Sequence, residues 1–204
     1  YKNLMPSTNS STIKVQKRDG KLENLDINKI HFVVEEACEG LAGVSSSQIE
    51  MNANIQFYDG MTTKDIQNVL VRSANDLISL ETPNYQYAAA RLLSYDVRKE
   101  AHGQYEYIPL LKLVLRNIRL GVYDKGIVEK YTKTDIKKLN TWIRRDRDLN
   151  FTYSGLRQVV DKYLVQDRSS GQLYETPQDM YMMIAATLFA DYPAKNRMSY
   201  VKKY

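Results

Sequence analysis

Residues 15–30 read VQKRDGKLENLDINKI, a pattern that predicts a β-hairpin running directly into a helix. Asp19 and Gly20 are typical of a two-residue hairpin turn, because glycine tolerates the positive φ that such turns require. Residues 12–18 and 21–25 are therefore expected to form the two strands. Asp26 stands where a helix N-cap belongs, just before an apolar run with helical spacing that includes Ile27 and Ile30.

This arrangement also predicts an anion site. The hairpin carries Lys17 and Arg18 towards a helix N-terminus whose first turn adds Lys29. Backbone N–H groups at a helix N-terminus are unpaired and the helix dipole is positive there, which favours a bound anion. Three cations around that end are typical of a phosphate site, although a charged turn on a solvated hairpin has the same pattern.

Composition indicates a globular protein that is mainly helical. Of 204 residues, 43% are hydrophobic and 26% are charged, while Gly and Pro are few, at 9 and 5. The net charge of +5 suits an anionic partner, such as a nucleotide, an acidic protein face or nucleic acid. The densest basic run, within residues 137–148, is interrupted by acids, so a solvated helix face is the favoured interpretation and no nucleic-acid partner is expected.

The small numbers of cysteines and histidines, and the lack of a long apolar run, exclude several classes of protein. One cysteine, Cys38, rules out an internal disulfide and a cysteine-rich zinc site, and two histidines offer little for a His-based metal site or triad. No apolar run approaches the roughly 20 residues that span a bilayer, and residue 1 does not begin a signal peptide. We therefore expect a cytoplasmic chain with no membrane partner.

The remaining pattern predicts an α+β fold that is mainly α-helical. Residues 1–11 are expected to be a flexible tail, and residues 12–103 a small domain of one hairpin and four helices. Residues 104–204 are expected to be helical with one short hairpin. The predicted helices cover about 27–41, 46–56, a segment that begins at Thr62 or Thr63, a segment that opens at Pro83 and ends at Gly103, 108–120, 124–131, 133–146, 153–164, a segment that opens at Pro177, and a segment after Pro193.

With these elements placed, the sequence resembles the N-terminal part of the large (α) subunit of class I (Ia) ribonucleotide reductase. The matching phrases occur in the right order from about Val15 to Tyr204. They are KRDG at 17–20, IQFYDG at 55–60, DLIS at 76–79, YQYAAARL at 85–92, Tyr105 after Gly103, DRD at 146–148, KYLVQ at 162–166 and YVKK at 200–203. The resemblance implies that residues 12–103 are an ATP cone, and that residues 104–204 precede the ten-stranded catalytic barrel.

The resemblance also implies an allosteric site for ATP or dATP. Lys17 and Lys29 would contact the triphosphate with Arg18 beside them, Glu23 and the backbone of residues 24–27 would surround the nucleoside, Thr63 would cover it, and Lys99 would return to the phosphates. The candidate binding set is Lys17, Arg18, Glu23, Asn24, Leu25, Asp26, Ile27, Asn28, Lys29, Thr63 and Lys99. Magnesium would arrive with the nucleotide, with no protein side chain as its ligand and no cofactor for chemistry in this segment.

The function implied is regulatory. ATP would activate and dATP would inhibit the reduction of ribonucleotides to deoxyribonucleotides, through contacts with the radical-generating small (β) subunit and with other α subunits. The reductase's chemistry needs cysteines in the barrel, and Cys38 matches none of them. These residues are therefore expected to be inactive alone and to be a fragment, either an expressed piece or one half of a split subunit.

Other interpretations stay open at this point. Well-known members of the family carry histidine at two places where this chain has Gln67 and Asp96. A carboxylate near a triphosphate is unfavourable unless it turns away, pairs with Arg98 or Lys99, or meets a metal. One alternative is therefore a cone-fold interaction module that has lost effector binding, and another is a basic helical nucleic-acid-binding protein. A cone-bearing transcriptional regulator would need four zinc-ligand cysteines.

Overall fold

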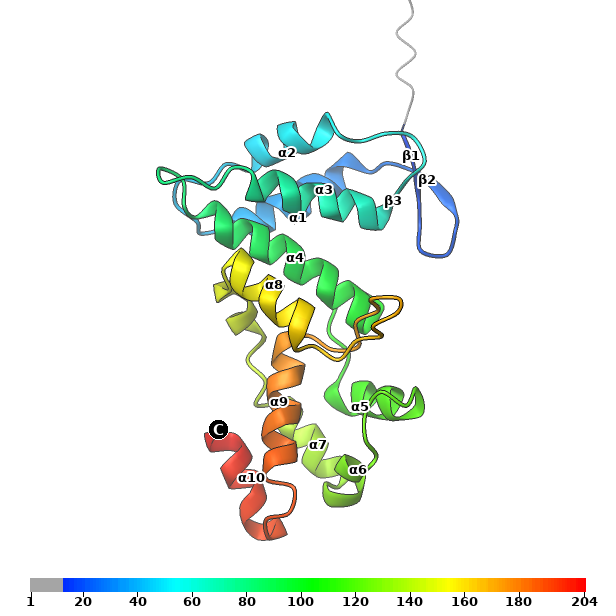
Figure 1. Cartoon of the computed structure of the whole chain (residues 1–204), viewed down its shortest axis with the longest axis vertical. Coiled ribbons are helices and arrows are strands. Elements are labelled where there is room, and N and C mark those ends of the chain that lie inside the picture. Colours follow the sequence, from blue (N-terminus) through cyan, green and yellow to red (C-terminus); the bar gives the residue numbers. More distant parts are fainter. Residues whose placement is uncertain (1–12) are drawn as a thin grey trace, which may run out of the picture.

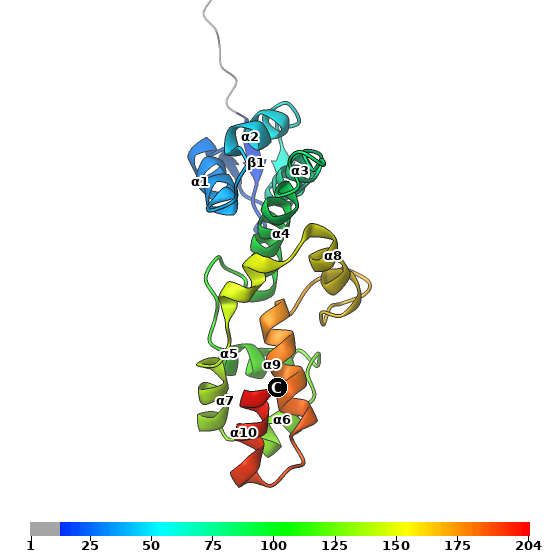
Figure 2. The ribbon, with the colours of Figure 1, turned by 90° about the vertical axis from the view of Figure 1, so that its left-hand side faces the viewer.

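The structure is a computed structural model that describes residues 13–204, so the predicted tail at residues 1–11 lies outside the described residues. It confirms a mainly helical α+β fold (Figures 1 and 2). In chain order the elements are β1 (Lys14–Gln16), β2 (Leu22–Asn24), α1 (Ile27–Cys38), α2 (Ser46–Asn54), β3 (Met61–Thr62), α3 (Thr63–Asn75), α4 (Tyr85–His102), α5 (Leu110–Arg119), α6 (Gly126–Lys130), α7 (Lys133–Asn140), the 3₁₀ helix η1 (Arg145–Asn150), α8 (Tyr153–Lys162), α9 (Pro177–Leu188) and α10 (Ala194–Lys203).

The N-terminal hairpin forms where the sequence predicts it, but its loop is longer. Strands β1 and β2 pair antiparallel, and beyond them the N–H of Lys17 donates to the carbonyl of Lys21 at 2.8 Å. The prediction of a two-residue turn is therefore wrong, because residues 18–20 all lie in the loop. Gly20 ends this loop with φ of 83°, and its N–H donates to the carbonyl of Lys17 at 2.9 Å. Three-residue hairpin loops characteristically place a left-handed glycine there.

A third strand, which the sequence pattern did not predict, completes the sheet. Strand β3 pairs in parallel with β1, so that Met61 lies opposite Val15 and Thr62 opposite Gln16. Both Met61 and Val15 are buried. A strand of two residues is too short to show an alternating pattern, and only its pairing with β1 reveals it. Its consequence is that the start of α3 lies beside the end of β1.

Side chains at the starts of α2 and α4 bind partners that are far away in sequence. The residues Ser45 to Gln48 have the sequence pattern of a capping box, and Ser45 does cap α2, but the Gln48 side chain accepts from the Tyr85 hydroxyl at 2.6 Å instead of bonding back to Ser45. That hydroxyl in turn accepts from the N–H of Ser45 at 3.0 Å. Helix α4 begins at Tyr85, two residues after Pro83, and Asn84 donates to the carbonyl of Ala42 at 2.8 Å rather than capping the helix. Its end at Gly103, with φ of 73°, is as predicted.

The long helix predicted over 133–146 is two elements. Helix α7 ends at Asn140, and the hydroxyl of Thr141 donates to the carbonyl of Lys138 at 2.7 Å. Such local side-chain bonds compete with the helical backbone ladder. The chain then turns into η1, which places Arg145 and Asp148 against the N-terminus of α9. The expected short hairpin is present near residues 164–174, with one antiparallel bridge between Gln166 and Leu173 and a backbone hydrogen bond on either side of it.

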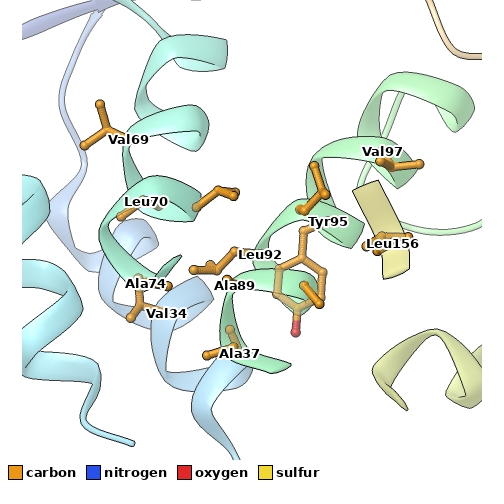
Figure 3. Packing of buried hydrophobic residues seen from close by; sticks show 14 of the residues in the cluster. Val34, Ala37, Val69, Leu70, Ala74, Ala89, Leu92, Tyr95, Val97 and Leu156 are labelled. Atoms are coloured by element: carbon orange, nitrogen blue, oxygen red, sulfur yellow. The ribbon is translucent and has the colours of Figure 1, made fainter. Parts of the chain in front are cut away.

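Two hydrophobic cores hold the helices together. The first joins the sheet, α1–α4 and α8, and Figure 3 shows its side chains: Val34 and Ala37 from α1, Leu70 and Ala74 from α3, Leu92 and Val97 from α4, and Leu156 from α8. The second lies among α5, α6, α7, α9 and α10, and includes Leu113, Tyr131, Ile136 and Ala186. Helix α8 thus packs on α4 although the two are far apart in sequence. No helix within residues 13–204 is both long enough and apolar enough to cross a membrane.

A buried polar network connects the end of α4 to α9. The Asp179 carboxylate accepts from Nε2 of His102 at 3.0 Å and from Nη2 of Arg145 at 2.6 Å, and neither the His102 nor the Asp179 side chain is exposed. His102 Nδ1 accepts from the N–H of Ile108 at 3.2 Å, so the histidine is the neutral tautomer that donates from Nε2. Asp179 also accepts from the N–H and the hydroxyl of Thr176 in a capping box. The network therefore fixes where α9 begins relative to α4.

Candidate functional site

The hairpin loop brings Arg18 against the last turns of α4. Its Nη1 donates to the carbonyl of Lys99 at 3.3 Å, and its Nη2 lies 3.6 Å from Oδ1 of Asp96. The loop follows β1, which is the central strand of the sheet and is paired with both β2 and β3. This pairing fixes the position of the loop. Two residues separated by 81 positions in sequence are thus in direct contact.

Lys99 lies in the field of three further cations. Partial burial lowers the pKa of the Lys99 ammonium, and the charges of Arg18, Lys17 and Lys29 lower it further, while Asp96 opposes them. Charges act on a pKa in this way only when they lie close by. The structure therefore brings together the four cations of the predicted set, one from α4, two from the hairpin and one from α1.

The N-terminus of α1 differs from the expectation in one respect. Its first N–H groups were expected to be unpaired, but the Asp26 carboxylate accepts from the N–H of Asn28 at 3.1 Å and of Lys29 at 3.2 Å. The expectation of unpaired N–H groups is wrong for these two residues, because the Asp26 side chain that caps the helix accepts hydrogen bonds from both of them. Lys29 itself stands 3.8 Å from Asp26 and remains largely exposed.

The predicted nucleoside-contacting residues follow one another from β2 into α1. Residues 23–28 are mostly exposed, and Ile27 at the first position of α1 shows 60% of its surface to solvent. The N–H of Leu25 donates to the carbonyl of Ile13 at 2.7 Å, which continues the hairpin to the helix. Glu23 forms an ion pair with Lys17 at 3.1 Å.

Thr63 reaches the same region through the strand that the sequence did not reveal. Thr62 pairs with Gln16 in β3, so Thr63, the first residue of α3, follows directly beside Lys17. Thr62 caps α3 in a capping box with Asp65, whose N–H donates to the Thr62 hydroxyl at 3.0 Å. The capping role therefore falls to Thr62, and the hydroxyl of Thr63 is not used by the cap.

The two positions that depart from the family pattern, Gln67 on α3 and Asp96 on α4, both have partners on another element. Gln67 donates to the carbonyl of Leu92 at 2.7 Å. Asp96 pairs with Arg18, whereas the notion that it pairs with Arg98 is wrong. Arg98 turns to the other side of α4 and lies over the rings of three tyrosines, 5.1 Å from Tyr95, 4.2 Å from Tyr105 and 4.9 Å from Tyr107. Cation–π contact of this kind holds a guanidinium away from the anion site.

Sequence reasoning missed one further charged pair at the site. Lys64 on α3 lies 3.3 Å from Glu100, and Glu100 also accepts from the N–H of Leu173 at 3.0 Å. The sequence held part of the evidence for this pair. Lys99 and Glu100 follow Asp96 by three and four residues, which places the three residues on one face of a helix. The partner Lys64 could be found only once α3 was packed on α4.

The positive charges of this region are its main chemical feature. Arg18 contacts the backbone of Lys99, and the charges of Lys17 and Lys29 also act on the Lys99 ammonium, so this region favours a bound anion. Within the part of the chain that the structure describes, no group of three or more His, Cys, Asp or Glu side chains is placed to hold a metal ion.

The basic run at residues 137–148 is not a free cationic surface. Arg144 makes two hydrogen bonds to Asp146, at 3.0 and 2.8 Å, and Arg145 is committed to the buried carboxylate of Asp179.

Comparison with known proteins matches two parts of this chain to families. Residues 13–100 match the ATP cone domain, and residues 149–204 match the all-alpha domain of ribonucleotide reductase. The chain is 44% identical over 195 residues to ribonucleoside-diphosphate reductase 1 subunit alpha of Escherichia coli strain K12. The matched residues make up 96% of this chain and 26% of that protein. It is 40% identical to the alpha subunits of Haemophilus influenzae, over 96% of this chain and 26% of that protein, and of Enterobacteria phage T4, over 94% and 25%. The chain spans about a quarter of the length of these relatives.

Proposed function

We propose that this chain, which joins an ATP cone domain to part of the ribonucleotide reductase all-alpha domain, is the allosteric N-terminal region of a ribonucleoside-diphosphate reductase large subunit. Residues 12–103 would be the regulatory cone, and residues 104–204 the helical segment that connects it to the catalytic part of the enzyme. Reduction of ribonucleotides is then the activity of the whole protein, and this segment controls it.

The observation that carries the proposal is the convergence of Lys17, Arg18, Lys29 and Lys99. We propose that these cations bind the triphosphate of ATP or dATP, which brings Mg²⁺ with it. Residues 23–28 and Thr63 would border the nucleoside, because they adjoin the cations along β2, α1 and β3. Electrostatic attraction between these positive charges and a triphosphate favours this arrangement.

The position of α4 suggests how the bound nucleotide would act on the rest of the enzyme. Helix α4 carries Lys99 near its end, and three residues later His102 is bonded to Asp179 at the start of α9. A nucleotide that moves Lys99 thus acts on the helix that also supports α8 and α9. ATP and dATP would in this way bias how the large subunit meets the small subunit and other large subunits, and those contacts would change effector affinity by the same factor.

Isothermal titration calorimetry of this chain with ATP and with dATP tests the proposal. We expect binding of both nucleotides, and we expect Lys99→Ala to weaken it at least about tenfold, because a charge-assisted contact contributes roughly 1.5–3 kcal/mol. Lys112→Ala is the matched control, since Lys112 is an exposed lysine on α5, outside the cone.

Circular dichroism establishes that each sample is folded. A folded wild-type chain that releases no heat with either nucleotide would refute effector binding and favour a cone that serves only as an interaction module. Equal weakening by Lys99→Ala and Lys112→Ala would mean that net charge, and not this site, attracts the nucleotide.

A further inference from the structure

Asp96 is an acidic residue placed among the cations of the effector site. Its carboxylate lies 3.6 Å from Nη2 of Arg18, and its side chain is only 13% exposed. The other end of the same guanidinium donates to the carbonyl of Lys99 at 3.3 Å. Arg18 is therefore held against α4 by both of its terminal nitrogens.

Two other cations near Asp96 have different partners, and Asp96 is paired with Arg18. Lys64 on α3 lies 3.3 Å from Glu100, whose other oxygen accepts the N–H of Leu173 at 3.0 Å. Arg98 lies over tyrosine rings on the other side of α4. Among residues 13–204, Arg18 is the one cation within ion-pair distance of Asp96.

We infer that Asp96 sets the affinity of the site by competing with the phosphates of the nucleotide for Arg18. The inference rests on the proposed function of the cone. A triphosphate can engage Arg18 fully only if the guanidinium leaves Asp96, and the carboxylate then repels the phosphates from a partly buried position. The nucleotide consequently binds more weakly than the four cations alone would allow, and it binds better when Asp96 carries a proton.

The surroundings of Asp96 determine the direction of the pH effect. Burial and the neighbouring charge of Glu100 raise the pKa of Asp96, and the charges of Arg18, Lys64 and Lys99 act in the opposite direction without cancelling them. As the pH falls, Asp96 takes up a proton more readily than an ordinary aspartate. Its competition for Arg18 then weakens, so acid conditions favour nucleotide binding by the wild-type chain relative to a variant without this charge.

Calorimetry with MgATP on the wild-type chain and on Asp96→Asn tests the inference. At about pH 8 the variant should bind about tenfold more tightly, and this ratio should become smaller as the pH is lowered, because Asp96 then takes up a proton. Titration of the phosphates themselves is the same for both proteins and cancels in the ratio. Asp161→Asn is the matched control, because Asp161 is also a helical aspartate paired with an arginine, 2.9 Å from Arg157, but on α8.

The outcomes separate this inference from the proposed function. If the wild-type chain binds MgATP and Asp96→Asn binds it equally or more weakly, the competition does not exist and Asp96 instead orients Arg18 or contacts Mg²⁺. If neither folded protein binds, the effector site itself is refuted. In an Arg18→Gln background the gain from Asp96→Asn should be smaller, and an undiminished gain would show that Asp96 does not act through Arg18.

Discussion

Replacement of Asp179 by asparagine should destabilise this chain more than any exposed Asp→Asn change. The carboxylate accepts from four donors, one each from His102 and Arg145 and two from Thr176. An amide keeps a single acceptor oxygen, so donors on one side of the group would face an NH₂. The Arg145 guanidinium, 2.6 Å away and largely buried, would also lose its counter-charge.

The expected loss is large because the pair is buried. Removing one partner of a buried charge pair costs roughly 3–5 kcal/mol. For a chain of 204 residues this corresponds to a decrease of about 6–20 °C in Tm. Burial acts to raise the pKa of Asp179, but the hydrogen bond from His102 and the charge of Arg145 outweigh it and hold that pKa below its usual range. The stabilisation is therefore complete above the pKa of an unfolded aspartate, and is lost as the pH falls below about 4.

Thermal unfolding followed by circular dichroism, at neutral and at acid pH, measures the effect. Asp146→Asn is the matched control, since Asp146 is paired with Arg144 on the surface of η1 and its replacement should leave Tm unchanged within error. A decrease in Tm for Asp179→Asn no larger than for Asp146→Asn would refute the reasoning. So would a deficit that stays constant as the pH is lowered.

Two further changes should act in opposite directions on stability. Asp148→Asn should stabilise the chain by at most about 3 kcal/mol at pH 7, because burial raises the pKa of Asp148 from 3.8 to about 6 and one of its oxygens has no hydrogen-bond partner among the described residues. Between about pH 4 and pH 6, Asp148 takes up a proton when the chain folds, so the gain in stability should disappear as the pH falls from about 6 to 4. A gain that stays constant in urea unfolding across this pH range would contradict the prediction. Tyr85→Phe should cost about 1–3 kcal/mol, since it leaves the N–H of Ser45 and the side chain of Gln48 without the hydroxyl that links them. A urea midpoint equal to that of the wild type would show that other groups replace that hydroxyl.

The parts of this protein that depend on neighbours in sequence could be predicted without a structure. The hairpin, the Asp26 cap and the end of α4 at Gly103 all follow from the preferences of a few adjacent residues. The family resemblance is likewise confirmed, since the two matched domains cover six of the eight phrases that carried it and the similarity to the alpha subunit of Escherichia coli covers 96% of this chain. Three of the four cations, Lys17, Arg18 and Lys29, lie within this local region.

What only the tertiary structure decided is which distant residues meet. The contact of Arg18 with Lys99 and Asp96 exists because β1 is held between two other strands and because α3 packs on α4. Likewise, the Gln48 side chain accepts from the Tyr85 hydroxyl and therefore does not form a capping box with Ser45. Hydrogen-bonding preferences act over three or four residues, whereas these contacts depend on how whole elements pack against a shared core, and packing has no signature at any one position in the chain.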